Sequence, residues 1–210
     1  MTERTSFLRQ QTLTGANKCK RAPLPNDWSV SNISASIPER KALGLKKIFE
    51  EMPVFIGEQE LIVGTRTLFR PQPGNEDGHN RFAYHLSSGI PYLSQEEIEQ
   101  FGADQSFCNK THYTPDFSIL LHKGIEGILN DVQKRLQDPA LSKHQQAFLN
   151  SVTIAYSGLQ VLILRYAQEA KRLADLSKGE EKQRLLTICN VCTQISKNKP
   201  QNFYEAVQLL

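Results

Sequence analysis

The sequence predicts a mainly α-helical protein with a few short strands and one long loop. Apolar residues recur at helical spacing over most of the chain from residue 38 onward. Helix-capping patterns start at Ser94, Thr114 and Asn202, where a side chain can satisfy the first free backbone N–H groups. Proline and glycine are frequent in residues 65–93, which indicates a loop that is functional or packs on a partner surface.

The amino-terminal part contains two predicted helices. Residues 1–37 form a polar segment, with a short helix near residues 3–13. A second helix begins at Pro38, because proline suits the first helical position, and it stops before Pro53. Two short β-like runs follow within residues 54–63.

The middle of the chain carries two helix starts. A capping box at Ser94 opens a short helix that ends at Phe101. We expect Thr114 to cap the next helix, with Asp116 complementing the helix dipole in the first turn, and Pro139 to end it.

The carboxyl-terminal part is predicted as helices over about residues 141–176 and 179–195, and a last helix from Asn202. The first of these has an apolar stripe, interpreted as core packing because it drifts from heptad spacing. The stripe consists of Phe148, Val152, Leu159, Leu162, Ile163, Tyr166 and Leu173. The last helix has an apolar face made of Phe203, Ala206, Val207 and Leu210. That face has little length to bury it, so we expect a chain truncated at its carboxyl end.

Composition excludes several classes of protein. The net charge is +3 and the basic residues are dispersed, so no nucleic-acid partner is expected. The longest apolar run, residues 161–164, is too short for a membrane span, so no membrane partner is expected. The first residues lack the apolar region of a secretory signal, which predicts a cytoplasmic location.

The four cysteines are interpreted as reduced thiols. Cys189 and Cys192 have the C-x-x-C spacing of a redox motif or of half a zinc site. No strand precedes them, and Cys19 and Cys108 supply no second pair. We therefore expect buried structural thiols and no metal site.

A few polar residues are candidates for ligand contacts. His112 precedes a predicted helix start, where an imidazole could face a polar ligand; the alternative is a loop histidine that bonds backbone. Asp116 is interpreted as a helix-terminal charge, with a polar pocket as the alternative. Five basic residues of the long loop could meet an anion, but a solvated loop is favoured: Arg66, Arg70, His79, Arg81 and His85.

Four segments, in this order, resemble the start of a pyruvate formate-lyase (formate acetyltransferase) domain of the glycyl radical enzymes. They are residues 39–43 with 52–56 (E-R-K-A-L and M-P-V-F-I), 60–64 (E-L-I-V-G), 111–117 with 121–128 (T-H-Y-T-P-D-F and L-H-K-G-I-E-G-I), and 199–209 (K-P-Q-N-F-Y-E-A-V-Q-L). The resemblance covers about residues 38–210, as the amino-terminal portion of that domain. Thr111 replaces the usual glycine, and the region from Gly64 to Thr111 looks shorter than in many relatives.

The resemblance implies the helical amino-terminal layer of a glycyl-radical-enzyme α/β barrel. In such an enzyme a glycyl radical, installed by an S-adenosylmethionine iron–sulfur activase, generates a thiyl radical on a buried cysteine. His112 and Asp116 would contact substrate in the complete enzyme. The implied partners are the missing carboxyl-terminal part of the enzyme, the activating enzyme, or a second copy of this chain.

The residues that perform the radical chemistry are missing from this sequence. The positions two residues after the four cysteines are Arg21, Lys110, Val191 and Gln194, whereas the family motif has glutamate there. None of the twelve glycines is followed by tyrosine or phenylalanine, as the radical glycine is. We therefore expect no catalytic residue and no bound cofactor in this chain, and an inactive fragment.

Two other functions stay open. One is a stand-alone helical interaction module that kept the family's outer layer and lost its barrel. The other is a small enzyme that uses His112 and Asp116 as an acid–base pair, for which no third catalytic group is evident. A neighbouring reading frame that encodes the cysteine and glycine motifs would establish the truncated enzyme.

Overall fold

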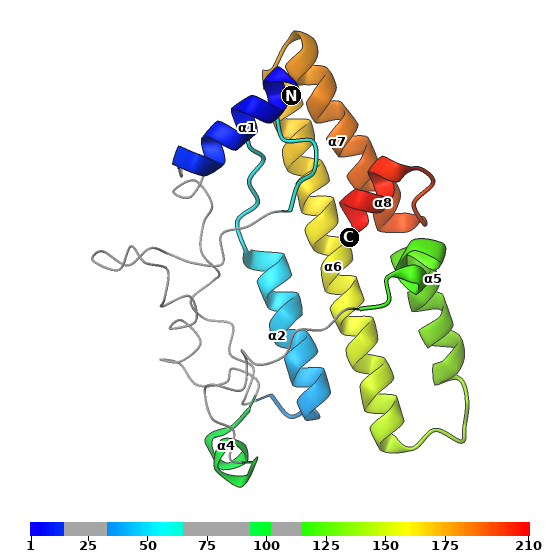
Figure 1. Ribbon diagram of the computed structural model, residues 1–210. Coiled ribbons are helices and arrows are strands. Elements are labelled where there is room, and N and C mark those ends of the chain that lie inside the picture. The colour runs from blue at the N-terminus through cyan, green and yellow to red at the C-terminus, as the bar shows by residue number, and fades with distance from the viewer. Residues whose placement is uncertain (15–32, 65–92, 102–114) are drawn as a thin grey trace.

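The computed structural model describes residues 1–14, 33–64, 93–101 and 115–210, and its regular elements there are all helices (Figure 1). They are α1 (Glu3–Thr14), α2 (Ile37–Glu51), α4 (Gln95–Phe101), α5 (Ser118–Leu136), α6 (Lys143–Leu176), α7 (Gly179–Lys197) and α8 (Phe203–Leu209). The mainly α prediction is therefore confirmed. The short strands expected within residues 54–63 are wrong, because this segment has no neighbouring strand in the described part of the chain.

Helix α6 is the centre of the fold. It packs against α2 on one side and α7 on the other, while α5 runs antiparallel beside it (Figure 1). Gly158 permits the close approach of α2, since a Cβ atom there would lie 2.9 Å from the Cα of Lys46. Helix α8 crosses the lower part of α7 near the start of α5.

Local capping sets most helix starts. The expected caps at Ser94 and Asn202 are confirmed: the Glu97 N–H donates to Ser94 Oγ at 3.2 Å, and the Glu205 N–H donates to Asn202 Oδ1 at 3.0 Å. Ser142 caps α6 in the same way, by accepting a hydrogen bond from the Gln145 N–H. These bonds join residues three apart, so the sequence alone can predict them.

The predicted start of α5 is wrong. The helix begins at Ser118 rather than near Pro115, and its capping residue, Phe117, makes no side-chain capping bond. Asp116 lies before the helix, where its Oδ1 accepts a hydrogen bond from the Ser118 N–H at 2.8 Å. Such a local turn competes with helix formation, which explains the later start.

The core consists of two clusters. The larger joins α6 and α7 to the irregular segment after α2, through buried residues that include Tyr166, Ala170, Ile188 and Cys192. The smaller is formed by Ile125, Ile195 and Leu209 from α5, α7 and α8. Of the predicted stripe on α6, Tyr166 is buried, and Leu162, Ile163 and Leu173 pack on the larger cluster. Phe148 is 56% exposed, so its assignment to the core was wrong.

Helix α6 is the one described helix that is long and apolar enough to cross a membrane, judged by length and composition. The expectation of no membrane span rested on the longest unbroken apolar run, residues 161–164, whereas the apolar residues of α6 are interrupted by polar ones. Only 11% of its most apolar window is fully buried. The helices α2, α5 and α7 pack along its sides, and none of residues 151–167 is exposed. A single helix of this kind is also typical of the core of a soluble domain.

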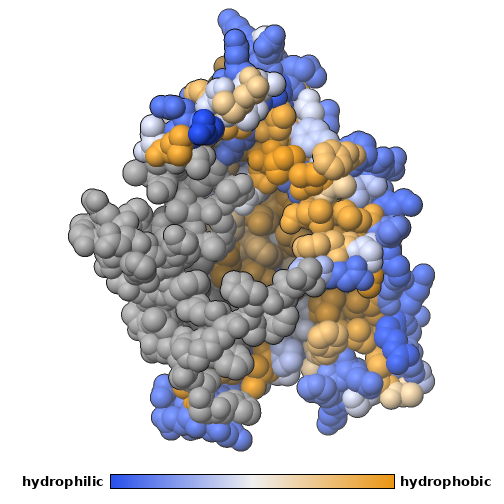
Figure 2. Space-filling view, viewed as in Figure 1, coloured by the Kyte–Doolittle hydropathy of each residue, from blue (hydrophilic) through white to orange (hydrophobic). Residues whose placement is uncertain are grey.

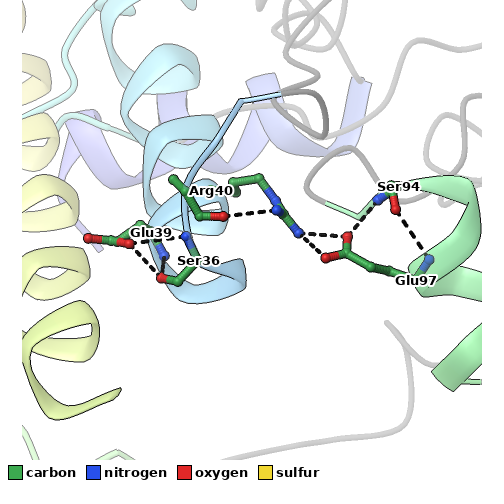
Figure 3. Close-up of polar contacts among 6 residues, drawn as sticks. Ser36, Glu39, Arg40, Ser94 and Glu97 are labelled. Carbon is green, nitrogen blue, oxygen red and sulfur yellow. Dashed lines mark hydrogen bonds and ion pairs between the residues drawn. The ribbon is translucent and has the colours of Figure 1, made fainter. Parts of the chain in front are cut away.

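An ion pair attaches α4 to α2. Arg40 Nη2 lies 2.5 and 2.6 Å from the two carboxylate oxygens of Glu97, and Arg40 Nη1 donates to the Ala35 carbonyl at 2.9 Å (Figure 3). Arg40 is buried, with 8% of its surface exposed. The backbone N–H of Ser94, together with the Arg40 guanidinium, holds the pKa of the Glu97 carboxyl below its ordinary value of 4.5.

This pair predicts an acid-sensitive contribution to stability. A carboxyl whose pKa is lowered by folding stabilises the native state above its unfolded pKa, and that contribution is lost as the pH falls through the folded pKa. We therefore expect Glu97→Gln to lower the melting temperature at pH 7 and to have a much smaller effect near pH 3. Melting temperatures of the wild type and the variant, measured by circular dichroism between pH 3 and pH 7, test this prediction. Glu96→Gln, on the exposed side of α4, is the control; equal effects of the two variants would contradict the prediction.

Candidate functional site

The segment that follows α2 is held by side chains from the far end of the chain. The Val63 N–H donates to Gln208 Oε1 at 2.9 Å, and Gln208 Nε2 donates to the Val63 carbonyl at 2.8 Å. The amide of Gln208 thus pairs with both backbone groups of one residue, as a neighbouring strand would. This explains why residues 61–63 need no strand partner.

Two more side chains hold the preceding residues. Arg184 Nη1 donates to the Glu60 carbonyl, and the Tyr204 hydroxyl donates to the Leu61 carbonyl. The Arg184 side chain is 5% exposed, and Glu181 orients it through contacts of 2.5 and 2.8 Å. The hydrogen bond from Arg184 lowers the pKa of the Glu181 carboxyl. We call residues 60–63, with Arg184, Tyr204 and Gln208, the backbone clamp.

A second junction joins α5 to the chain before α8. Gly124 interrupts α5 with φ 66° and ψ 177°, which only glycine adopts readily. A Cβ atom there would lie 2.8 Å from the backbone N and Cα of Lys199. The neighbouring Ile125 is fully buried against Leu209. Three of the four segments singled out in the sequence therefore pack around α7 and α8. They are residues 60–64, 121–128 and 199–209.

A hollow of about 370 Å³ opens beside the clamp. Its lining is formed by Ile62, Val63, Gly64, Leu159, Leu162, Ile163, Tyr166, Cys192, Val207, Gln208, Leu209 and Leu210. Figure 2 shows apolar residues gathered around the place where α6 and α8 meet on this face. None of the lining residues is charged.

The sequence-predicted site residues are not brought together in the described structure. His112 lies outside the described residues, as do Thr111, the five basic residues of the long loop, Cys19 and Cys108. Asp116 is exposed and is not part of the hollow. Its hydrogen bonds with Ser118 hold the pKa of its carboxyl below the ordinary range.

The structure describes two of the four cysteines, those of the C-x-x-C pair. Cys189 is half-buried and Cys192 is 1% exposed, as expected for structural thiols. Burial raises the pKa of Cys192 to about 12, so its sulfur stays a protonated, unreactive thiol at neutral pH. In the described residues, no three His, Cys, Asp or Glu side chains are grouped closely enough to hold a metal ion.

Arg184, which makes a hydrogen bond across 124 positions, was not among the residues predicted from the sequence. The available signal was the Glu181–Arg184 pair at helical spacing, which usually indicates an exposed ion pair. Its burial depends on residues 59–61, more than a hundred positions earlier, so the local pattern could not reveal it.

Residues 93–210 match a family model described as pyruvate formate lyase-like. The chain is 30% identical to trans-4-hydroxy-L-proline dehydratase from Clostridioides difficile, over 99% of this chain and 32% of that protein. It is 27% identical to isethionate sulfite-lyase from Oleidesulfovibrio alaskensis, over 49% of this chain and 13% of that protein. The chain spans about a third of the length of the dehydratase.

Solved structures share this fold. Glycerol-bound B12-independent glycerol dehydratase from Clostridium butyricum matches with a TM-score of 0.68 and 25% identity, over 100% of this chain and 33% of that chain. A glycyl radical enzyme from Archaeoglobus fulgidus matches with a TM-score of 0.67 and 24% identity, over 85% of this chain and 29% of that chain. The alignment to the hydroxyproline dehydratase extends over 256 positions, more than the 210 residues of this chain. This chain is therefore shortened relative to that enzyme, a shortening that the sequence analysis placed between Gly64 and Thr111.

Proposed function

Because this chain belongs to the pyruvate formate lyase-like family, we propose that it forms the amino-terminal helical layer of a glycyl radical enzyme and supplies structure rather than radical chemistry. The backbone clamp carries this proposal. It joins two segments that resemble the family, residues 60–64 and 199–209, through three hydrogen bonds, and Arg184 of α7 donates a fourth to Glu60. These bonds satisfy backbone groups within the chain, so those groups are not presented to a substrate.

The chemistry of the parent enzyme is proposed from its relatives. The dehydratase is similar over nearly the whole chain, and the sulfite-lyase over about half of it. We therefore favour an elimination that cleaves a C–O or C–S bond over transfer of an acetyl group to formate. His112 and Asp116 are the proposed substrate contacts in the complete enzyme. Asp116 accepts a local bond from the Ser118 N–H through Oδ1, and its carboxylate has further acceptor sites for a substrate donor.

Cofactor and partners follow from the same proposal. The glycyl radical would reside on the part of the enzyme that this chain does not contain, installed by an S-adenosylmethionine iron–sulfur activase. The chain itself would bind no cofactor, and its partners would be the rest of the enzyme, the activase or a second copy. The net charge of +3 gives no reason to add nucleic acid or a membrane surface, so we place the protein in the cytoplasm.

Electron paramagnetic resonance tests the proposal. We expect the purified 210-residue chain to give no glycyl radical doublet after anaerobic incubation with reduced activase and S-adenosylmethionine. The reason is that none of its twelve glycines is followed by tyrosine or phenylalanine. Full-length trans-4-hydroxy-L-proline dehydratase with its own activase is the positive control. A doublet from the 210-residue chain, or turnover of an alcohol substrate, would overturn the proposal.

A further inference from the structure

We propose that the groove at the turn between α5 and α6 binds an acidic peptide segment of a partner protein through one aromatic or aliphatic anchor residue. The turn lies at the end of α6 opposite to its junction with α7 (Figure 1). The groove shares no lining residue with the hollow beside the backbone clamp. The inference goes beyond the proposed function and does not depend on radical chemistry.

The groove has a volume of about 270 Å³ and offers an apolar contact to a partner. Its lining is formed by Arg135, Leu141, His144, Gln145, Phe148 and Leu149. Phe148 is 56% exposed, and Leu141 and Leu149 are half-buried. An aromatic or aliphatic side chain placed against these three would remove apolar surface from water, so the groove favours an apolar anchor.

The surface around the groove carries an excess of positive charge. Four basic side chains flank the turn: Lys134, Arg135, Lys143 and His144. Residues 132–168 contain a single acidic residue, Asp138, whose carboxylate lies 2.7 Å from Arg135. Charge complementarity therefore favours a partner that brings carboxylates around its anchor.

The acids of the neighbouring helices have partners of their own. Asp131 of α5 pairs with Lys123, and Glu39 of α2 accepts hydrogen bonds from Ser36 and Asn150. These contacts lie outside the groove lining. The positive charge at the turn is therefore available to an acidic segment from outside the chain.

The first turn of α6 breaks a local rule in a way that favours the same partner. The helix dipole places partial positive charge at this end, where acidic side chains are stabilising and basic ones are not. The first turn of α6 contains no acidic residue and begins with Lys143 and His144. Carboxylates from a partner would supply the negative charge that the local sequence lacks.

A strand of nucleic acid would also bring negative charge, but it fits the groove less well. Such strands bind by stacking successive bases on several aromatic side chains, and Phe148 is the one aromatic residue of the lining. The carboxylate of Asp138 at the turn would also repel a phosphate backbone. A short peptide can supply both the anchor and the carboxylates from adjacent residues.

Fluorescence anisotropy with defined peptides tests the inference. The probe is a fluorescein-labelled peptide in which one phenylalanine lies between three glutamates on each side. We expect the 210-residue chain to bind it about tenfold more tightly than a peptide with alanine at the centre, or with lysines in place of the glutamates. Added salt should weaken the binding, because it screens the charges of an exposed site.

Lys143→Glu is the informative variant, and Lys182→Glu is its matched control. Both lysines are exposed in the first turn of a helix, so the two changes alter the net charge equally and agree with the helix dipole. We expect Lys143→Glu to weaken peptide binding about tenfold and Lys182→Glu to leave it unchanged. Thermal unfolding should show that both variants are as stable as the wild type. Phe148→Ala should abolish the preference for the phenylalanine peptide over the alanine peptide.

Several outcomes would overturn the inference. Equal affinity for the three peptides, or equal affinity of Lys143→Glu and the wild type, would show that the groove selects no acidic anchor. Tighter binding of a labelled oligothymidine strand would make nucleic acid the ligand instead. Self-association in sedimentation velocity that Lys143→Glu abolishes would make a second copy the occupant. The radical measurement described above tests the proposed function independently of all these outcomes.

Discussion

Gly124→Ala is expected to destabilise the folded chain by about 3 kcal/mol, through backbone strain and a clash together. Gly124 has φ 66° and ψ 177°, a region that residues with a Cβ atom adopt only under strain. The added methyl group would lie 2.8 Å from Lys199 N and Cα and 3.0 Å from the Asn198 carbonyl carbon. These are backbone atoms, so the clash can be relieved only by moving the chain before α8.

A comparison with Gly179→Ala separates the cost of backbone strain from the cost of the steric clash. Gly179 also has a left-handed φ, 57°, but a Cβ atom there would meet nothing within 4 Å. Its alanine variant should therefore lose only the conformational term, about 1 kcal/mol. The free energies of unfolding, measured by urea titration with circular dichroism, test the difference. Equal losses at the two positions would show that the contact with residues 198–199 contributes nothing.

Arg184→Met is expected to cost about 2 kcal/mol, because the charged donor to the part-buried Glu60 carbonyl is lost. Methionine keeps much of the apolar stem but cannot donate to the Glu60 carbonyl or pair with Glu181. The hydrogen bonds from Tyr204 and Gln208 to the segment 60–63 would remain. We therefore expect faster hydrogen exchange at the Val63 amide as well as lower stability.

The chain contains a matched control for this variant. Arg172 pairs with Glu169 three residues earlier at 2.7 and 2.8 Å, the same arrangement as Arg184 with Glu181. Its side chain is 59% exposed, and its ion pair with Glu169 lies within α6. Arg172→Met should leave the unfolding midpoint and the Val63 exchange rate unchanged, because exposed pairs contribute little. A comparable loss of stability in both variants would mean that the ion pair between residues three apart stabilises the fold, and that the hydrogen bond from Arg184 to Glu60 does not.

These two predictions concern the same part of the molecule. Gly124 and Arg184 lie on α5 and α7, and both act on chain that contacts α8 or the backbone clamp.

The sequence by itself determined the helices and most of their starts. Ser94 and Asn202 cap α4 and α8 through hydrogen bonds to residues three positions away. Such short-range bonds depend on the residue types within one helical turn, so the sequence predicts them. The apolar spacing of α6 likewise predicted that Tyr166 faces a core.

Only the tertiary structure decided how distant segments meet. The β-like pattern of residues 54–63 indicated strands, but Gln208, 145 positions after Val63, satisfies the backbone there instead. The spacing of Glu181 and Arg184 is typical of an exposed pair, but the bond of Arg184 to Glu60, across 124 positions, holds Arg184 in the interior. Gly124 fits a family segment in the sequence, yet its need for glycine comes from Lys199, 75 positions later. Local patterns report the hydrogen bonds and periodicities within a few residues, whereas these partners are set by the packing of whole helices, which no local pattern encodes.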